Sequence, residues 1–385
     1  MKEKKILYIT RPLSPPWDEA SKNFAYNLAQ QIALKNSNFE INILTKKKLT
    51  NLSSNIRQYS IYTSSQNDFN WRQKKYLFQF LLKTILQNKF NLWHSFFTPT
   101  KMNTFLLKTI FNLSFKKNKP RTIQTIATLR EDLYSEKEFK KILFADWLIT
   151  YSHYALKRLK KMGFKNVTQI YPGIDLKKFK LTSKNSFLLK KYNFSQNDFI
   201  INFTGEYVRL NAIDDVISSF LEISQKIPQA KLSLAVRVKN SQDAQKKKEV
   251  IQFLQKNNLL KRVAFHDDGN YTMSDIYNLA DVSLFPVQNM QGKFDIPLAV
   301  IEAMACEKPV VISDIPILQE FSNQKNSVQI KAGNFKQLSN AVIDLYKNPE
   351  KRLKIGKRAR QYVKNNFNLE NAEQKYSQLY HSLLK

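Results

Sequence analysis

The sequence predicts an α/β protein built from two similar domains, and three observations support this prediction. Short apolar runs of strand length alternate with helical patterns along most of the chain. These runs are apolar throughout, which is typical of parallel strands buried on both faces. A turn signal at residues 171–175, followed by a polar stretch at 177–185, interrupts the alternation in a chain of 385 residues, too long for one ordinary domain. We therefore expect two domains that face a cleft.

The first domain opens with a βαβ pattern. An apolar run at residues 5–10 is followed by a Pro-rich polar loop, a helix at 20–34 and a strand at 40–45. The same alternation continues toward the turn signal. We expect further strands at 92–94, 121–127, 146–150 and 167–170, and helices at 76–86, 102–111, 137–144 and 154–162.

The second domain repeats the alternation. Its expected strands lie at 199–204, 231–238, 262–265, 281–285 and 309–312. Helices are expected at 212–227, 245–257 and 273–279, followed by one that begins at Pro297, and three helices close the chain, the last at 369–384. Because ligands bind at the carboxyl ends of strands in open α/β sheets, each domain should present a ligand site to the cleft.

The helix that begins at Pro297 contains an isolated acidic residue. Every residue from Ile296 to Cys306 is apolar except Glu302. A helix that is apolar all round is buried, and a buried carboxylate without a partner is costly. Glu302 is therefore either a structural residue that accepts hydrogen bonds from nearby backbone, or a residue that binds a polar ligand, and the helix alone does not separate the two.

Gly205 stands between a predicted strand and a helix in a chain with only 7 glycines. A glycine at this point allows close approach of a ligand, and the helix N-terminus beyond it favours an anion. Arg209 could add a bidentate contact to a phosphate, although an arginine in such a place is more often an ordinary surface residue.

Several segments together resemble the group 1 (family 4) glycosyltransferases of GT-B fold. The most specific is Phe294 to Val311, which contains Glu302-Ala-Met-Ala-Cys-Glu-Lys-Pro-Val-Val. The resemblance extends to the turn at 170–175, the loop at 205–213, the segment at 277–286 and the final segment at 367–384. It covers the C-terminal half densely and the N-terminal half mainly in architecture.

The resemblance implies two Rossmann-like domains and a C-terminal helix that crosses back. The expected divisions are an acceptor-binding domain at 1–172, a donor-binding domain at 173–366, and the returning helix at 367–385. The implied activity is the transfer of a sugar from a UDP- or GDP-sugar to a glycan or lipid-linked acceptor, with retention of configuration and without a cofactor or metal. The alternative is a non-catalytic protein that binds a nucleotide sugar or glycan.

The resemblance also implies roles for individual residues. Glu302 would accept hydrogen bonds from ribose hydroxyls, and Arg209 would meet the diphosphate. The implied catalytic residues are Arg209, Asp295 and His94, although a lone histidine at a strand end is more often structural. The implied donor-binding residues are Gly205, Arg209, Asn211, Lys293, Asp295, Ile296, Pro297, Leu298 and Glu302, and the acceptor-binding residues are Asp18, Glu19 and Ser21.

This chain departs from the family pattern at several places. Phe294 stands where an acidic residue is usual, and Asp295 is the expected substitute. Asn211 replaces a usual lysine, for which Lys293 or Arg237 could compensate. The double glycine that usually follows the first strand is replaced by residues 18–21. The altered acidic position and the missing lysine are the reason for the non-catalytic alternative.

The formal net charge of +31 is unevenly distributed. Residues 1–180 contain 33 Lys/Arg and 11 Asp/Glu, a balance of +22, whereas the rest contains 29 and 20, a balance of +9. An anionic partner, either a membrane or a nucleic acid, or compositional bias toward lysine could each explain this excess. We find no nucleic-acid-binding motif, signal peptide or membrane span, and expect a cytoplasmic protein that contacts the inner face of the plasma membrane peripherally.

Overall fold

The computed structural model of the chain describes residues 3–15, 17, 19–63, 69–96, 100–112, 119–267 and 271–385. The chain forms two compact units. The first unit contains residues 1–173, 294–296 and 369–385, and the second contains 174–293 and 297–368. Among the described helices, none is both long enough and apolar enough to cross a membrane.

The first unit is built on a parallel sheet of seven described strands in the order β3-β2-β1-β4-β5-β6-β7. Its strands are β1 (Lys4–Ile9), β2 (Phe39–Thr45), β3 (Ile56–Ser60), β4 (Leu92–Ser95), β5 (Arg121–Ile126), β6 (Trp147–Thr150) and β7 (Val167–Gln169). Its helices are α1 (Ala20–Lys35), α2 (Trp71–Leu86), α3 (Lys101–Asn112), α4 (Glu136–Ile142), α5 (His153–Lys161) and α13 (Leu369–Leu383).

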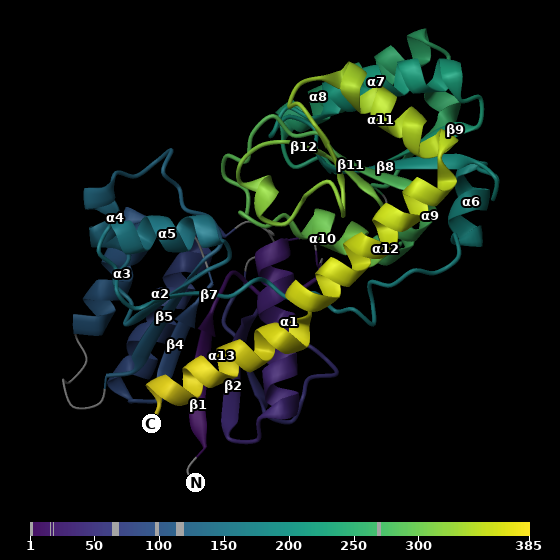
Figure 1. The fold of residues 1–385 in the computed structure, drawn as a ribbon. Helices are drawn as coiled ribbons and strands as arrows, with labels where there is room; N and C mark the ends of the chain where they lie inside the picture. Colours follow the sequence, from purple (N-terminus) through teal and green to yellow (C-terminus); the bar gives the residue numbers. More distant parts are fainter. Residues whose placement is uncertain are drawn as a thin grey trace. The chain divides into compact units, whose positions relative to one another are not determined.

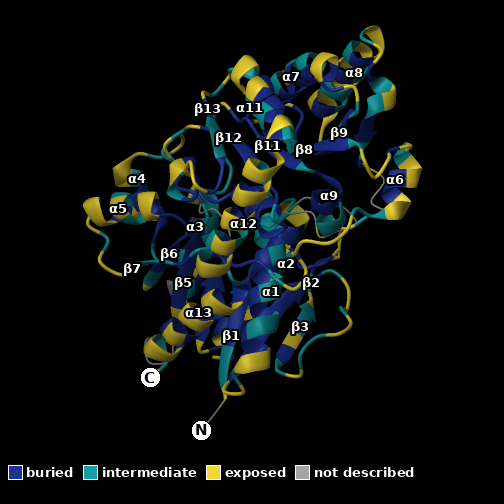
Figure 2. Cartoon of the chain, turned by 45° about the vertical axis from the view of Figure 1, so that its right-hand side comes forward, coloured by how far each residue is buried: buried dark blue, intermediate teal, exposed yellow. Residues whose placement is uncertain are grey.

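The inner strands of this sheet are covered on both faces. All seven residues of β2 are buried, and so are the last four of β1. Figure 2 shows the strands of the unit largely in the colour of buried residues, with exposed residues on the outer faces of the helices. This burial agrees with the continuously apolar runs that predicted parallel strands.

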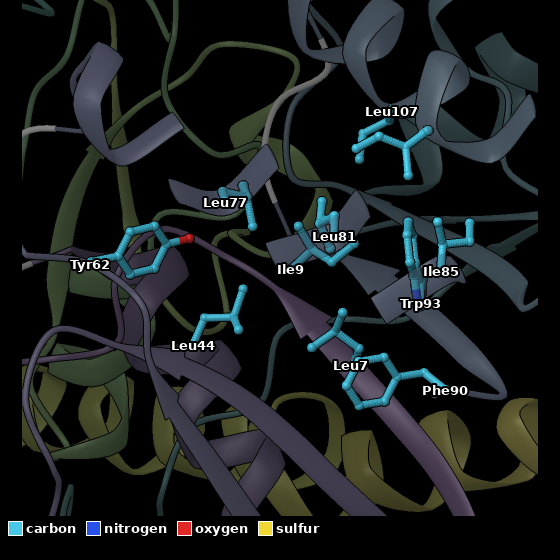
Figure 3. Close-up of a cluster of buried hydrophobic side chains, with 11 residues drawn as sticks. Leu7, Ile9, Leu44, Tyr62, Leu77, Leu81, Ile85, Phe90, Trp93 and Leu107 are labelled. Carbon is cyan, nitrogen blue, oxygen red and sulfur yellow. The ribbon is translucent and has the colours of Figure 1, made fainter. Parts of the chain in front are cut away.

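One core cluster of the first unit lies between the sheet and helices α2 and α3. Figure 3 shows Leu7, Ile9 and Trp93 from the sheet beside Leu81 and Leu107 from the helices. These apolar side chains are removed from water, which is the main favourable term in folding. The cluster therefore fixes α2 and α3 on the sheet.

The last helix belongs to the first unit. Helix α13 packs alongside α1, as Figure 1 shows for the yellow and purple helices. Asn36, which follows α1, donates to Glu373 at 2.8 Å and to Ser377 at 3.2 Å. The chain thus returns to its first unit after completing the second, as the predicted crossing-back helix requires.

The second unit contains a parallel sheet of six described strands in the order β10-β9-β8-β11-β12-β13. Its strands are β8 (Phe199–Glu206), β9 (Ala230–Arg237), β10 (Val263–Phe265), β11 (Val282–Phe285), β12 (Val310–Ser313) and β13 (Val328–Ile330). Its helices are α6 (Ser186–Tyr192), α7 (Ile213–Lys226), α8 (Ser241–Lys256), α9 (Met273–Leu279), α10 (Leu298–Ala305), α11 (Phe335–Lys347) and α12 (Pro349–Asn366), with 3₁₀ turns at Leu260–Arg262 and Leu318–Glu320.

Both sheets reverse their strand order at one point. The chain builds outward from β1 to β3 before returning to β4, and outward from β8 to β10 before returning to β11. The carboxyl ends of strands at such a switch point form the usual ligand crevice of open α/β sheets. In the second unit this point lies between β8 and β11.

The structure differs from the predicted elements in several places. It adds β3, α6 and β13, which are short, and α2 begins at Trp71 rather than at residue 76. Pro297 is the extended N-cap of α10, with ψ of 107°, and not its first helical residue. The units also differ from the expected domains, because residues 294–296 belong to the first unit.

Candidate functional site

Glu302 lies on α10, beside the switch point of the second sheet. The predicted burial of this helix is observed, since Leu298, Val300, Ile301, Ala303, Met304 and Ala305 are all buried. The hydroxyl of Tyr277 donates to Oε2 of Glu302 at 3.1 Å. Burial of the carboxyl group raises its pKa to about 7, although Tyr277 and the charge of Lys178 act in the opposite direction. Glu302 itself is half-buried, and the partial loss of water around its carboxyl group disfavours the charged form.

A small hollow lies next to Glu302, under α10. It is lined by residues of β11, β8 and α10. Its walls carry the hydroxyl and amide side chains of Tyr277, Thr204, Ser283 and Asn202. The hydroxyl of Ser283 is buried without a hydrogen-bond partner. The surface that faces the hollow is nevertheless mainly apolar, with Leu284, Phe285 and Val300 among its lining residues.

Glu206, at the carboxyl end of β8, gathers three cations. Arg209 donates from Nε to Oε2 at 2.5 Å and from a terminal nitrogen to Oε1 at 2.8 Å. Lys239 and Lys293 donate to the same Oε1 at 2.5 and 2.7 Å. Glu206 is only 6% exposed, and these contacts hold the pKa of its carboxyl well below the usual range despite burial. We call these four residues the Glu206 cluster.

The loop that carries Arg209 has an unusual backbone. Leu210 has φ of 77° and Asn211 has φ of 51°. The left-handed region is uncommon for residues other than glycine, and for leucine it costs on the order of 1–2 kcal/mol. The carbonyl of Leu210 accepts from the backbone N–H of Gln288 at 2.9 Å, which helps to hold this conformation. Strain of this kind concentrates at functional sites.

The expected phosphate loop differs from its sequence interpretation in one respect. The first turn of α7 contains Asp214 and Asp215, whose negative charges oppose the positive end of the helix dipole. Positive charge near this helix start therefore comes from side chains rather than from the helix alone. At Gly205, a Cβ would lie 2.5 Å from the ring of Phe203, which explains the glycine as a packing requirement. Asn211 is exposed.

The structure holds Asp295 within the first unit. Its carboxylate accepts a hydrogen bond from Ser152, and its backbone N–H donates to the carbonyl of Ala127 at 3.0 Å. Asp295 is 6% exposed. Its expected partners Gly205, Arg209 and Lys293 belong to the second unit. The role of Asp295 toward a donor sugar stays a prediction.

His94, one of the implied catalytic residues, lies in the interior of the first unit. His94 has no exposed surface, and its two ring nitrogens lie 2.6 Å from the hydroxyl of Tyr380 and 2.7 Å from that of Thr125. Burial holds its pKa well below the ordinary value, so that the ring is neutral. His94 links β4 to α13, which agrees with the structural alternative for a histidine at a strand end, and its catalytic role stays a prediction.

The expected acceptor-binding residues precede or begin α1. Asp18 lies outside the described residues. Glu19 is the N-cap of α1 and forms an ion pair with Arg11 at 3.0 Å. Ser21 is half-buried in the first turn of the helix. No described contact of these residues assigns an acceptor to them.

The expected donor-binding residues at the start of α10 are covered. Ile296, Pro297 and Leu298 are all buried, and their contact with a donor stays a prediction. The other expected donor-binding residues lie on separate segments of the second unit. Gly205 is on β8 and Arg209 is in the loop after it. Lys293 directly precedes Phe294, and Glu302 is on α10. Among the described residues, no cluster of three His, Cys, Asp or Glu side chains is arranged to hold a metal ion.

Sequence reasoning did not single out Glu206, Lys239, Tyr277 or Ser152. Glu206 directly follows Gly205, and an acidic residue at a predicted phosphate loop was a signal that could have been used. Lys239 follows the end of β9, next to β8 in the sheet, a neighbour relation that the sequence does not state. Ser152 caps α5 by accepting from the backbone of Ala155, and capping alone would have explained it.

Comparison with known families gives a match over the second unit. Residues 185–362 match the family model described as glycosyl transferases group 1. The capsular polysaccharide biosynthesis glycosyltransferase CapM of Staphylococcus aureus is 26% identical over 217 residues. That alignment covers 55% of this chain and 53% of CapM, so that the chain matches about half the length of this relative. These matches support the resemblance inferred from the residues around Glu302.

Solved structures share the fold of the whole chain. Anabaena HepE, in complex with UDP and glucose, has a TM-score of 0.76 at 14% identity, covering 99% of this chain and 100% of that one. Sucrose-phosphate synthase from Thermosynechococcus elongatus has a TM-score of 0.76 at 20% identity, covering 99% of each chain. The predicted fold class, α/β with two Rossmann-like domains of GT-B type, is confirmed.

Proposed function

We propose that this chain transfers a sugar from a nucleotide diphosphate-sugar to an acceptor. The proposal starts from the family match to group 1 glycosyltransferases at residues 185–362 and from the GT-B fold. One observation supports this most directly. Around the carboxyl ends of β8 and β11, the second unit carries a carboxyl group suited to hydroxyls, Glu302, and a group of cations suited to phosphates, the Glu206 cluster. A nucleotide sugar has both kinds of group.

In this proposal the donor is a UDP- or GDP-sugar. Glu302 accepts hydrogen bonds from the ribose hydroxyls. When the carboxylate is ionised, these hydrogen bonds are charge-assisted and therefore stronger. Arg209 and Lys293 meet the diphosphate, and their charge stabilises the leaving nucleotide as its bond to the sugar breaks. The sugar is transferred with retention of its anomeric configuration, and the protein's cations serve without a metal ion.

The acceptor is a glycan or a lipid-linked glycan of the cell envelope. Helices α2 and α3 contain six Lys/Arg and no Asp/Glu, and they expose Trp71 and Phe105. Between these helices lies a hollow of about 370 Å³ with a mainly apolar lining that includes Leu77, Leu107 and Ile110. Basic helices with exposed aromatic residues suit the surface of an anionic membrane. The proposed location is cytoplasmic, with peripheral contact at the inner face of the plasma membrane.

A second function is nucleotide-sugar or glycan binding without transfer. It is favoured by the engagement of Arg209 with Glu206 and of Asp295 with Ser152, because both residues were expected to act on the donor. The two functions share the donor site. They differ in whether a bound nucleotide sugar is consumed.

A screen of nucleotide sugars with the full chain tests the proposal. We expect one UDP- or GDP-sugar to be hydrolysed slowly in the absence of acceptor, with release of the nucleoside diphosphate measured by chromatography. NMR of the released sugar at early times reports the anomeric configuration, and EDTA should leave the rate unchanged. Binding of a nucleotide sugar without turnover, including with cell-envelope extracts as acceptor, would favour the binding protein. Absence of binding to every nucleotide sugar would reject both functions.

Arg209→Ala separates an active phosphate loop from a structural one. Loss of a charge that acts on the leaving group should lower kcat by about two to three orders of magnitude, with a smaller change in KM. Lys226→Ala, on the last turn of α7, is the matched control and should leave the rate unchanged. Normal turnover in Arg209→Ala would show that the loop has been misassigned.

A further inference from the structure

We propose that Glu206 is a positioning residue that arranges Arg209, Lys239 and Lys293 as one cation site for the diphosphate of the donor. This inference rests on the proposed nucleotide-sugar function. It adds two residues to that function, because Glu206 and Lys239 were not among the expected site residues. It also places a carboxylate, which has the same sign of charge as the ligand, within a phosphate site.

The geometry explains why an acidic residue belongs in a phosphate site. Three like charges held together repel one another, and one carboxylate in contact with all three offsets that repulsion. Oε1 of Glu206 accepts from Arg209, Lys239 and Lys293, and Oε2 accepts from Arg209. The carboxylate thus fixes the three cations relative to one another before any ligand arrives, which reduces the ordering cost of binding.

Burial determines which side of the cluster a ligand meets. Only 6% of the Glu206 side chain is exposed, whereas 45% of Arg209, 39% of Lys239 and 29% of Lys293 is exposed. Each ammonium has three N–H donors and uses one on Glu206. Glu206 therefore lies at the buried bottom of the site. The remaining N–H donors of the two lysines are available to an anion.

Charge and position suit a diphosphate ester. Three cations and one carboxylate leave a net charge of +2, which balances the two negative charges of a nucleotide diphosphate-sugar. The cluster lies where β8 ends and where the chain leaves β9, two neighbouring strands whose carboxyl ends share one edge of the sheet. Ligands of open α/β sheets bind at this edge. The strained backbone of Leu210, next to Arg209, shows that the surrounding structure holds the loop in place.

Lys293 makes the proposed role of Glu206 measurable. Burial lowers the pKa of Lys293, Arg209 and Lys239 lower it further, and Glu206 raises it. Among the described residues, these three are the charged groups that act most strongly on it. Glu206→Gln removes the one contribution that favours the charged ammonium. In that variant Lys293 should lose its proton at a lower pH than in the wild type.

The first test uses calorimetry of the full chain with UDP and with inorganic pyrophosphate. Lys239→Met should weaken UDP binding by about tenfold or more, the loss expected for one charge-assisted hydrogen bond. The control is Lys261→Met. Lys261 is exposed and lies just before β10, at the amino ends of the strands rather than at their carboxyl ends, so this variant should bind UDP as the wild type does. Pyrophosphate, which has no base or ribose, should show the same ranking of variants.

The second test is the pH dependence of UDP binding in Glu206→Gln. We expect binding to weaken by about tenfold between pH 7.5 and 9 in the variant and to change much less in the wild type, because one cation is lost. A residue with a purely structural role would change the melting temperature without introducing this pH dependence. If Glu206→Gln does not fold, Lys239→Met decides the question alone.

The outcomes separate this inference from the proposed function. If the wild type binds UDP or GDP and Lys239→Met binds equally well, the inference is overturned and the function stands. If Glu206→Gln folds and binds UDP as the wild type does at both pH values, the positioning role is overturned. If the wild type binds neither nucleotide nor pyrophosphate, the proposed function fails as well.

Discussion

Glu302 is an acidic residue that the fold accommodates at a cost. Its pKa of about 7 lies above the ordinary value of 4.5 because burial disfavours the charged form. Over this range the folded chain keeps a proton that the unfolded chain releases. The free energy of unfolding contributed by Glu302 is therefore greatest below pH 4.5 and falls as the pH rises to about 7.

We predict that Glu302→Gln stabilises the protein at pH 8 while weakening donor binding. The amide has no charge to bury, so the free energy of unfolding should rise by about 1–3 kcal/mol. Loss of a charge-assisted acceptor should weaken UDP binding by about tenfold. Denaturant unfolding and calorimetry measure the two effects. A structural role predicts the reverse, namely a destabilised variant with unchanged UDP affinity.

His94 should make the first unit sensitive to acid. Its folded pKa is lowered well below 6.5, so the unfolded chain takes up a proton that the folded chain excludes. The free energy of unfolding should then decrease by up to about 1.4 kcal/mol per pH unit as the pH falls below 6.5. His94→Gln, which keeps polar atoms but does not titrate, should lack this decrease.

The same substitution tests whether His94 has a catalytic role. At pH 8 the ring is neutral and its nitrogens are occupied by Tyr380 and Thr125. We expect His94→Gln to lower the melting temperature while the folded fraction keeps its turnover within about threefold of the wild type. A loss of turnover by orders of magnitude in a folded variant would restore a catalytic role.

At the scale of elements, α10 is held in place by α12. Arg360 of α12 donates to the carbonyl of Ala305 at 2.6 Å, at the end of α10. Gly356 of α12 lies so close to the following turn that a Cβ would be 2.1 Å from the carbonyl oxygen of Glu307. The glycine thus allows the two helices to approach, and their contact positions Glu302.

We predict that Gly356→Ala destabilises the second unit by about 2 kcal/mol or more, because backbone atoms must separate. Helix propensity alone predicts the opposite sign, since alanine in a helix interior is favoured over glycine by about 1 kcal/mol. Thermal unfolding measures the sign directly. Lys357→Ala, an exposed neighbour on the same helix, is the control and should change stability little.

At the scale of the whole molecule, the charge asymmetry has a structural counterpart. The excess of Lys and Arg in residues 1–180 includes Arg72, Lys74 and Lys75 on α2. Lys74 lies 5.4 Å from the ring of exposed Trp71. A solvated surface formed by compositional bias would need no such aromatic residue. An anionic membrane surface would attract both kinds of side chain.

We predict that the full chain co-sediments with anionic vesicles at low salt and is released at high salt. Each Lys or Arg near the surface contributes about 1 kcal/mol, and salt screens this attraction. Changing Arg72, Lys74 and Lys75 to Gln should reduce binding by about tenfold or more. The matched control changes exposed Lys354, Lys357 and Lys364 of α12 to Gln. Equal loss in both variants would indicate a nonspecific effect of charge, and recovery of the wild type in every supernatant would support compositional bias.

Local sequence determined the fold class and one part of the site. Apolar runs and turn residues are properties of neighbouring positions, so they identified most strands and the apolar helix of Glu302. Short elements were missed because β3 has only one buried residue and β13 has three residues in all. Such segments owe their conformation to the sheet they join rather than to their own pattern.

Only the tertiary structure decided which charged and polar groups meet. Lys239 and Lys293 are 33 and 87 residues from Glu206, and strand order together with the return of the chain places them on one carboxylate. His94 acquired its partners Thr125 and Tyr380 in the same way, across 31 and 286 residues. A local residue pattern indicates which secondary structure a segment favours and which of its faces is buried. Residues far away in the chain create the surroundings of His94 and Glu206. They bury the histidine between β4 and α13, and they bring three cations to the glutamate.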